Sequence, residues 1–493
     1  MKKILSLLLV LIMMFSMFAC TNTDDQKESG NESQSDSASE SQSDSAKESD
    51  SESESESAVE TPTELEVKDL GGLTYVYWGD NTVEFGKEDY DGTTITHALK
   101  EKIDYVEDTY NVDIKWKNIS YELDDIRNIV ATKADECQLA GSYAMWILRS
   151  SLEGLYYNVR ELPHFQFDSD AWSATTNDTL TINGIMHIMV NNIHASTYTG
   201  LRGMYYGKTL ANELGLAHPY QAVLDGKWTW DMLYSMTEGV YQDIDEEPGA
   251  SMNDRHGFVG NGAYFGWMEG WGIENLVEND KGAVEFVFDA ERVQSLIDIL
   301  IKNLSGDHGY NIGWTEGTFP NFAEGRILFT FDHLNRNLQN PAEGLSKCTT
   351  PCGILPMPKV DENQADYVAG FDAHGMAIPV TVVKKNLEDV ALVTEALNNA
   401  GLEFAAPVYF ENMFKTRYSD TNEDAMMYDI IRKTSVISLS YLFDLKLNQN
   451  LIYSCVSFDH GRVNGTDFSS YVAENRALDE AYVDVINNFY GGK

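Results

Sequence analysis

Side chains suited to binding an uncharged ring gather between Asn261 and Trp271. This stretch holds three glycines and four aromatic residues within eleven positions. Glycine disfavours helix, so the pattern predicts a loop. Aromatic faces on such a loop suit a pyranose ring, whose C–H groups pack against π faces. We therefore take Tyr264, Trp267 and Trp271 as candidate ligand contacts, with packing in a core or against another part of the protein as the alternative.

Polar and aromatic residues also follow the first predicted strand, which covers residues 73–78. Trp78, Asp80 and Asn81 come at its end, and we expect Ser142 and Tyr143 to lie in a corresponding later loop. Ligands of open α/β sheets bind beyond the carboxyl ends of the strands. These five residues are therefore candidate ligand contacts, although Trp78 is equally suited to a core position.

Two more groups of polar residues complete the candidate site. Asp332 and Arg336 follow a predicted strand, and Asp372 and His374 come later in the chain. Carboxylate, imidazole and guanidinium groups can bond to sugar hydroxyls, and Arg336 could also meet a carboxylated sugar. A surface turn is the alternative for the first pair, and packing without ligand contact is the alternative for the second.

Motifs for covalent or metal chemistry are missing from the sequence. It contains no GxSxG, HExxH, P-loop or GxGxxG pattern. Two acidic segments, 243–249 and 420–424, lack the glycine and the final glutamate of a calcium loop. We expect no catalytic residue, no cofactor and no metal. A glycoside hydrolase stays open as an alternative, because 78 carboxylates offer many pairs at glycosidase spacing.

The first elements of the globular part follow from hydrophobic spacing. A strand is predicted over 73–78, and alternation predicts a buried strand at residues 112–116, which includes Trp116. Between them one helix face is predicted, formed by Ile95, Leu99, Ile103, Val106 and Tyr110. Strand, helix and strand in this order predict a parallel pair. Further on, Ile182 to Ile185 has the pattern of a hairpin turn.

The N-terminus has the layout of an export signal. Two lysines precede an apolar run over 4–18, which is short for a membrane span but suits a signal peptide. The run ends at Ala19-Cys20, which resembles the lipobox of bacterial lipoproteins. That resemblance implies a signal peptide over 1–19 and a lipidated Cys20, with an ordinary secreted protein as the alternative. Residues 20–65 are rich in Ser, Glu and Asp and predict a disordered tether.

Charge excludes several classes of partner. The 493 residues carry a net charge of −43; residues 1–20 contribute +2 and residues 21–65 contribute −12, so residues 66–493 hold −33. Binding nucleic acid needs a basic surface, which a pI near 4.4 does not supply. The same charge disfavours anionic ligands.

The cysteines give little information about function. Besides Cys20 the chain has Cys137, Cys348, Cys352 and Cys455. An even set in an exported chain permits disulfides, and Cys348 and Cys352 could close a small loop. Their spacing is not CxxC, so we expect free or structural thiols and no redox chemistry.

Five phrases, in order along the chain, resemble those of one protein family. This family is the extracellular solute-binding proteins of carbohydrate ABC importers, the maltose-binding-protein-like family 1. Residues 201–215 are similar to its "LYYNKDLLEEAG" segment, and 227–233 to its "TWDEL" helix start. The other three phrases are 322–330, 353–359 and 374–388, similar to "FAQGKAAMY", "VAPLPK" and "AIPKTSKNPE".

This resemblance implies an α/β, two-lobed periplasmic-binding-protein-like fold of type II, with hinge-connected lobes and a ligand cleft. The chain would cross between lobes near Thr199, Phe371 and Met413. Lobe 1 would then comprise 66–198 plus 372–412, and lobe 2 would comprise 199–371 plus 413–493.

The resemblance also implies a function. The protein would be a monomeric, lipid-anchored substrate-binding protein that captures a neutral oligosaccharide for an ABC permease and has no enzymatic activity. It would sit on the extracytoplasmic face of the bacterial cytoplasmic membrane, or at the cell surface of a Gram-positive organism, and touch the membrane only through its lipid. The alternatives are a secreted glycoside-active enzyme and a sugar-sensing surface lipoprotein without a transporter.

Overall fold

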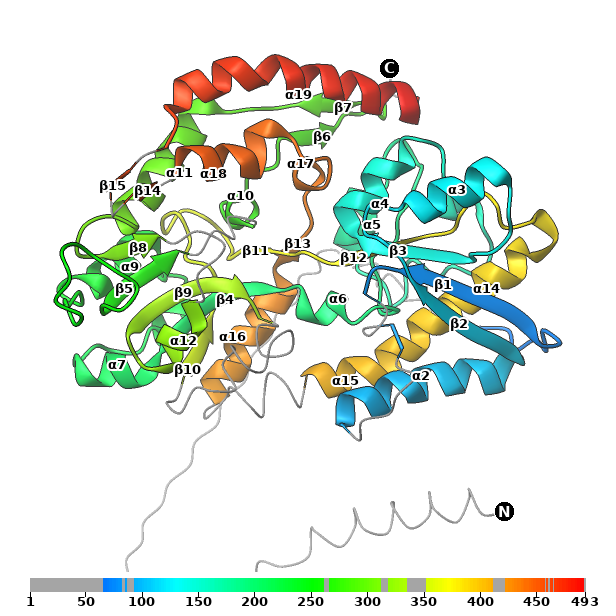
Figure 1. Ribbon diagram of the computed structural model, residues 1–493, viewed down its shortest axis with the longest axis horizontal. Coiled ribbons are helices and arrows are strands. Elements are labelled where there is room, and N and C mark those ends of the chain that lie inside the picture. The colour runs from blue at the N-terminus through cyan, green and yellow to red at the C-terminus, as the bar shows by residue number, and fades with distance from the viewer. Residues whose placement is uncertain are drawn as a thin grey trace, which may run out of the picture. The chain divides into compact units, whose positions relative to one another are not determined.

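The computed structural model describes most of the compact unit Glu60–Lys493 (Figure 1). The described residues are 65–81, 85–86, 93–260, 266–311, 318–334, 352–410, 422–456, 458–459, 462–463 and 465–491. Cys20, Tyr264, Arg336, Cys348 and the predicted crossing near Met413 lie outside them. In the part described, no helix combines the length and the apolar character that a membrane span requires.

The first sheet begins with the predicted strand–helix–strand unit. Strand β1 (Leu73–Gly79) pairs in parallel with β2 (Val112–Asn118), and helix α2 (Thr94–Tyr110) connects them. Thr93 caps α2 by accepting a hydrogen bond from the Thr96 N–H, which satisfies a free donor of the first turn. Leu99, Ile103 and Val106 on the predicted face of α2 are buried. The parallel pair is confirmed, although Trp116 is only half-buried.

Two more strands complete this sheet in the order β12-β3-β1-β2. Strand β3 (Leu139–Tyr143) is parallel to β1, whereas β12 (His374–Ala377) runs antiparallel to β3. Gly79 and Gly141 are cross-strand neighbours on either side of the buried Tyr77 ring. A Cβ atom at either glycine would lie 2.3 Å from the Tyr77 hydroxyl oxygen. The two glycines therefore let the ring fill the space where both strands end.

Helices and short turns surround the first sheet. The predicted turn at Ile182–Ile185 is confirmed, because Asn183 and Gly184 both have positive φ and Ile182 bridges Ile185. The remaining elements of this part are α3 (Asp124–Thr132), α4 (Ala144–Ser151), η2 (Val159–Glu161), α5 (Ala174–Leu180), α6 (Ser196–Thr199), α14 (Lys384–Ala400), the π-helix η4 (Gly401–Ala405) and α15 (Ala406–Val408).

The second sheet has five strands in the order β10-β4-β9-β5-β8. Its aromatic core includes Trp228, Trp230, Phe258 and Phe329, all buried. Its strands are β4 (Arg202–Gly207), β5 (His256–Gly260), β8 (Gly309–Asn311), β9 (Ile327–His333) and β10 (Cys352–Leu355).

The helices around the second sheet include the one predicted from the "TWDEL"-like phrase. It is α9 (Trp230–Thr237), and Thr229 accepts a hydrogen bond from the Met232 N–H as its cap. The others are α7 (Lys208–Glu213), α8 (Tyr220–Leu224), α10 (Trp267–Gly270), α11 (Ala290–Asn303), α12 (Thr318–Ala323) and α16 (Asn422–Lys433).

Extended segments connect the regions of the two sheets. Leu201 forms a bridge with Phe371, next to the start of β4 and shortly before β12. Beside it, β11 (Ala369–Gly370) pairs in parallel with β13 (Ser435–Val436). These are two of the segments where the sequence predicts the chain to cross.

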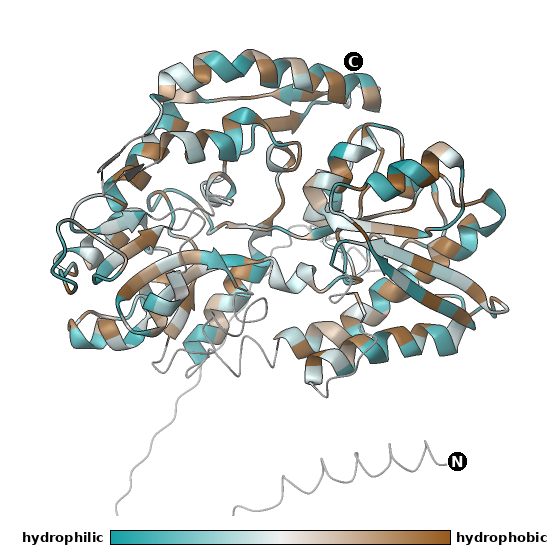
Figure 2. Cartoon of the chain, in the orientation of Figure 1, coloured by the Kyte–Doolittle hydropathy of each residue, from teal (hydrophilic) through white to brown (hydrophobic). Residues whose placement is uncertain are grey.

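The C-terminal segment spans the regions of both sheets (Figure 1). Helix α19 (Phe468–Tyr490) has alternating hydrophobic and hydrophilic positions (Figure 2). Near its middle, Asp479 accepts hydrogen bonds from the backbone of Lys446 and Leu447; at its end, Tyr490 accepts one from Asn183. The other elements here are β6 (Leu276–Glu278), β7 (Val284–Phe286), α17 (Leu439–Leu442), η6 (Lys446–Asn450), α18 (Leu451–Cys455), β14 (Phe458–Asp459) and β15 (Arg462–Val463).

Candidate ligand-binding site

Three predicted site residues meet at the carboxyl edge of the first sheet. Asp80 follows β1 and His374 begins β12. Ser142 and Tyr143 are the last two residues of strand β3, so the expectation that they lie in a loop is wrong. The His374 Nε2 atom lies 3.0 Å from Asp80 Oδ1, and the Ser142 hydroxyl lies 3.1 Å from Asp80 Oδ2. The convergence follows from parallel strands β1 and β3 ending at one edge, with the antiparallel β12 starting there.

A second histidine, which the sequence did not single out, supports this group. The His194 ring stacks on His374 at 4.1 Å between centroids, and its Nε2 lies 2.9 Å from the Asn81 carbonyl oxygen. Burial, followed by the proximity of His374, holds the pKa of His194 well below its usual value. His194 is therefore neutral at physiological pH. The predicted Asn81 enters this network through its backbone.

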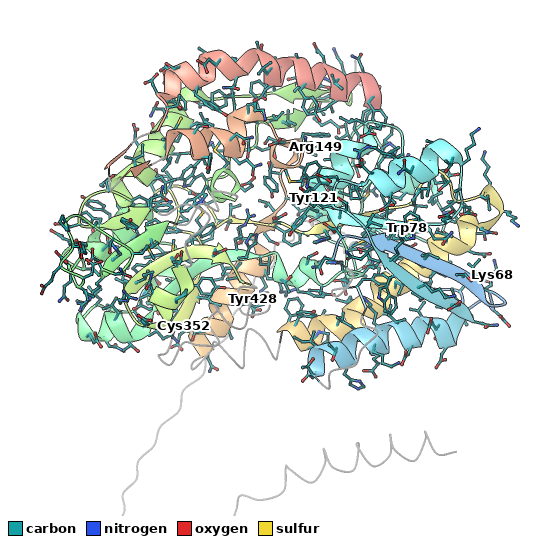
Figure 3. All side chains as sticks on the ribbon, in the orientation of Figure 1. Lys68, Trp78, Tyr121, Arg149, Cys352 and Tyr428 are labelled. Atoms are coloured by element: carbon teal, nitrogen blue, oxygen red, sulfur yellow. The ribbon has the colours of Figure 1, made fainter. Side chains whose placement is uncertain are left out.

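Aromatic side chains are exposed beside the polar group. Tyr143 and Tyr121 are 43% and 47% exposed. The Tyr143 ring lies 4.7 Å from that of His374, and Tyr121 lies 5.4 Å from Trp146. The hydroxyl of Ser142, the neighbour of Tyr143, is 3.3 Å from the Tyr121 carbonyl oxygen, so the two tyrosines belong to one edge. Tyr121 is labelled in Figure 3. Tyr143 was predicted as a contact; Tyr121 and Trp146 were not, because no spacing rule marks them.

Trp78 does not offer a free aromatic face. It is 5% exposed, and the Lys117 ammonium lies 3.9 Å from its ring centroid. The structure favours a core position for Trp78, because Tyr77, Trp78 and Gly79 are all buried at the end of β1 and the Lys117 cation lies over the Trp78 ring.

Trp267 and Trp271 also lie in a core rather than on a loop surface. They are 1% and 0% exposed. Trp267 packs against Trp230, Phe331 and Trp271 at centroid distances of 5.5, 4.8 and 6.2 Å. The expectation that glycines exclude helix here is wrong for Trp267–Gly270, which forms α10. Gly266 precedes it with φ of 87°, so this glycine starts the helix.

Asp332 and Asp372 belong to a buried ionic cluster where the chain passes between sheets. Asp332 and His333 lie within β9, not after it. The Arg202 guanidinium donates to Asp372 at 3.4 Å and to His333 at 3.2 Å. Burial alone would raise the pKa of Asp372, but His333 and Arg202 outweigh it and lower that pKa. Asp332 and Asp372 therefore have protein partners at the connecting segments.

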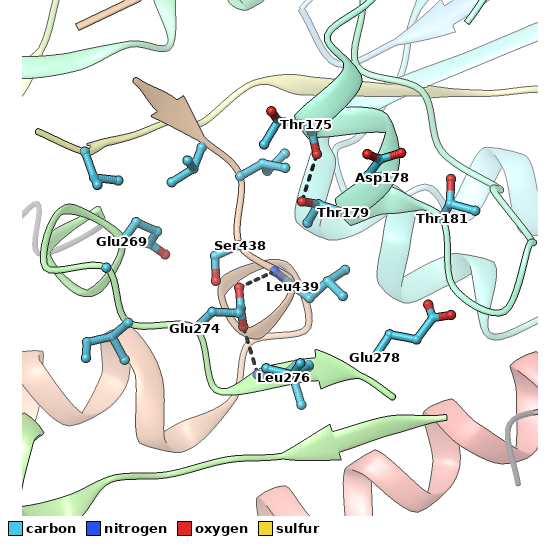
Figure 4. A pocket seen from close by; sticks show the side chains of 16 residues that line it. Thr175, Asp178, Thr179, Thr181, Glu269, Glu274, Leu276, Glu278, Ser438 and Leu439 are labelled. Carbon is cyan, nitrogen blue, oxygen red and sulfur yellow. Dashed lines mark hydrogen bonds between the residues drawn. The ribbon is translucent and has the colours of Figure 1, made fainter. Parts of the chain in front are cut away.

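A pocket of about 520 Å³ opens next to this cluster, between α5, the α10–β6 segment and the β13–α17 segment (Figure 4). Glu269, on α10, lines it and is 5% exposed. Burial raises the pKa of Glu269 to about 7. The lining residues are Thr175, Asp178, Thr179, Thr181, Glu269, Gly272, Ile273, Glu274, Leu276, Val277, Glu278, Val368, Val436, Ile437, Ser438 and Leu439.

One acidic group elsewhere has spacing suited to a metal ion. Oxygen atoms of Asp243, Asp245 and Asp254 lie within 4.8 Å of one another. Asp254 accepts hydrogen bonds from the Ile244 and Ser251 N–H groups, so its oxygens already have donors. The cluster acts as a loop-closing network, and nothing else about it indicates an ion.

Comparison with known proteins gives a result at the level of structure. A scan of the sequence against protein-family models finds no match, and a search of curated proteins finds none either. Solved structures do match. A sugar transporter protein from Rhizobium etli in an open conformation is 11% identical, with a TM-score of 0.57 over 83% of this chain and 100% of the other.

Two further structures agree with this result. The galacto-N-biose-/lacto-N-biose I-binding protein of the ABC transporter from Bifidobacterium longum has 10% identity and a TM-score of 0.55, covering 85% of this chain and 98% of its own. UgpB from Mycobacterium tuberculosis, in complex with glycerophosphocholine, has 15% identity and a TM-score of 0.53, covering 84% and 98%. The chain has the two-lobed fold of periplasmic-binding-protein-type substrate-binding proteins.

In this fold the first sheet belongs to one lobe and the second sheet to the other. The Tyr121–Tyr143 edge lies on the first lobe. The pocket takes Thr175 to Thr181 from the first lobe and Glu269 to Glu278 from the second. The predicted α/β, two-lobed fold is thereby confirmed.

Proposed function

We propose that this protein is a substrate-binding protein that captures a carbohydrate and delivers it to an ABC permease. The observation that carries the proposal is the pocket of about 520 Å³ lined from both lobes. A ligand held there would touch both lobes at once, and so would favour their approach. The fold supports this reading, since its structural neighbours include the lacto-N-biose complex of a transporter protein.

The exposed aromatic edge of the first lobe supplies the second part of the proposal. Tyr121 and Tyr143 present rings on which a sugar can stack. His374, whose ring packs against Tyr143, bonds Asp80, and Asp80 also accepts from Ser142. We therefore propose that these two tyrosines, in place of the buried Trp267, supply the stacking faces. No covalent step is involved: binding and lobe closure suffice for capture and release.

The anchor and location follow from the N-terminal pattern. We propose that residues 1–19 are removed, that Cys20 carries lipid and that residues 20–65 tether the lobes outside the bacterial cytoplasmic membrane. The lipid would be the protein's contact with the membrane, and the permease its protein partner. Twenty apolar residues are needed for a span, and the run over 4–18 is shorter.

A thermal-shift screen against mono- and oligosaccharides tests the proposal. A ligand at 100 times its dissociation constant stabilises the folded state by about 2.7 kcal/mol, which is readily measured. We expect at least one saccharide to raise the melting temperature in a concentration-dependent manner. Stabilisation by amino acids or peptides, with none by any saccharide, would contradict carbohydrate capture and leave the fold unchanged.

A further inference from the structure

The ionisable side chains that line the inter-lobe pocket are all acidic. They are Asp178 from the first lobe and Glu269, Glu274 and Glu278 from the second (Figure 4). Among the described lining residues none is Lys, Arg or His. The rest of the lining is hydroxyl or apolar, so the pocket favours a ligand group that is positively charged.

The four carboxylates differ in whether the protein already uses them. Glu274 accepts hydrogen bonds from the N–H groups of Leu276 and Leu439 at 2.9 and 3.0 Å. Glu278 accepts one from the Asn183 N–H at 3.2 Å. Both therefore contribute to the structure of the pocket wall.

Glu269 has no such role. It is 95% buried, yet neither carboxyl oxygen has a hydrogen-bond partner on another described residue. Its side chain points from α10 toward Ser438 and Glu274 across the pocket (Figure 4). A buried carboxylate without donors costs several kcal/mol unless something else supplies them. The pocket is where that donor can enter.

We propose that this pocket binds the ammonium group of an aminated carbohydrate, with the Glu269 carboxylate as the hydrogen-bond acceptor. The inference rests on the proposed function and names its substrate class. A hydroxyl group could donate one hydrogen bond but would leave the carboxylate charge buried. An ammonium group donates up to three hydrogen bonds and also neutralises that charge.

The charges around Glu269 agree with this assignment. The positive charge of Arg202 favours the ionised form of Glu269, whereas the negative charges of Glu274 and Asp372 disfavour it. Arg202 donates to Asp372 and His333, and neither Glu269 carboxyl oxygen has a hydrogen-bond partner among the described residues. The net charge of −33 over residues 66–493 disfavours anions but attracts cations. The sequence-based expectation of a neutral sugar considered the repulsion of anions but not the attraction of cations.

Titration calorimetry on the full chain can separate the ligand classes with matched probes. Glucosamine, N-acetylglucosamine and glucose differ only at carbon 2, and chitobiose, N,N′-diacetylchitobiose and cellobiose repeat the comparison on a disaccharide. We expect the aminated member of at least one series to bind about tenfold or more tightly than its partners, as a charge-assisted hydrogen bond implies. Equal affinities within both series would overturn the proposal and leave carbohydrate capture standing.

A pair of isosteric variants tests the role of Glu269. Glu269→Gln should remove the preference for the aminated sugar, whereas Glu395→Gln should keep it. Glu395→Gln is the matched control, since Glu395 is also buried with a pKa raised to about 7 but bonds Trp172 away from the pocket. A Glu269→Gln protein that unfolds at the wild-type temperature and keeps the preference would contradict the proposal.

Proton release gives an independent readout. Because a bound cation lowers the pKa of Glu269, binding of glucosamine near pH 6 should release a proton, detected by repeating the titration in buffers of different ionisation enthalpy. The wild type should release a proton and Glu269→Gln should not. Release by both proteins would mean that another group loses the proton, which would overturn the assignment to Glu269. A plain diamine such as putrescine that binds as tightly as any amino sugar would support the ammonium site but contradict carbohydrate capture. Failure of every aminated probe to bind would overturn the ammonium site.

Discussion

The Arg202 guanidinium donates a hydrogen bond to the Asp372 carboxylate across 3.4 Å, at the point where the chain leaves one lobe and enters the other. Arg202 begins β4 of the second lobe, and Asp372 lies between β11 and β12. The Arg202 side chain is only 2% exposed. The pair therefore ties together two connecting segments that are 170 residues apart in sequence.

Loss of the Arg202 side chain should destabilise the protein strongly. Arg202→Met leaves Asp372 buried with one cationic partner fewer, and removing one member of a buried pair costs about 3–5 kcal/mol. The free energy of unfolding in urea measures this. Arg476→Met, at an exposed pair with Glu480, is the matched control and should change it by less than about 0.5 kcal/mol. A small effect at Arg202 would show that the pair is not a structural tie.

The buried Glu395 should make stability fall as the pH rises. Its pKa is about 7 in the folded protein against 4.5 as the ordinary value, so the folded state binds more protons than the unfolded state between those values. The contribution of Glu395 to stability is therefore greatest below pH 4.5 and declines as the pH rises through about 7, by about 3 kcal/mol in total. Glu395→Gln should remove this part of the dependence, measured as unfolding midpoints at acidic and neutral pH. An unchanged pH profile in the variant would contradict it.

The buried Lys102 should have the opposite pH effect. Its ammonium nitrogen donates to the carbonyl oxygens of Phe85 and Ile193 at 2.6 and 2.7 Å, and burial lowers its pKa to about 7. The folded state then binds fewer protons than the unfolded state above pH 7. Stability from this group should therefore rise by about 3 kcal/mol between about pH 7 and pH 9. Lys102→Met should abolish the rise, while Lys100→Met, at an exposed position, should keep it.

Substitution of Tyr143 should weaken saccharide binding, whereas substitution of Trp267 should weaken folding. Tyr143→Ala removes an exposed ring and should weaken saccharide binding by at least about 1 kcal/mol, with the melting temperature preserved. Trp267→Ala leaves a cavity in the second lobe and should cost about 3–5 kcal/mol of stability. Calorimetric titration and thermal unfolding of both variants test the assignment. The reverse pattern would return the stacking role to Trp267.

Cys20 should determine where the mature protein is found. Cys20→Ala should move the protein from the membrane fraction to the soluble fraction or leave the signal uncleaved. Cys137→Ala, at a buried free thiol, should leave the distribution unchanged. Cell fractionation and the mass of the mature N-terminus report both outcomes. A Cys20→Ala protein that is still cleaved and membrane-bound would exclude the anchor.

The sequence predicted the elements whose signals are local. The helix face from Leu99 to Tyr110 and the cap at Thr229 depend on spacing and on one side chain. Asp80 and Ser142 were correctly expected at one edge, because parallel strands end together. For such residues the neighbours in sequence decide the conformation.

The burial and the partners of residues that contact distant segments could not be predicted from the sequence. Trp267 was a candidate ligand contact on a glycine-rich loop, with core packing as the open alternative; Trp230 and Phe331, from other segments, enclose it. His194 and Arg202 carry no motif, and their importance depends on His374 and Asp372, which lie about 170 residues or more away. The unpartnered state of Glu269 is likewise a property of the assembled pocket.

Helix α19 has a consequence for the range of motion between the lobes. Its Asp479 is fixed to the backbone of η6, while Tyr490 is buried beside Ser151 and Asn183 of the first lobe. A lobe rotation that moved the C-terminal end of α19 away from the first lobe would expose the Tyr490 ring to water, at a cost of about 2–3 kcal/mol for the ring alone. We expect the lobe motion that keeps this contact to pivot about the connecting segments and Tyr490. This geometry favours a twist of one lobe over the other and resists a wide gape on the side that α19 covers.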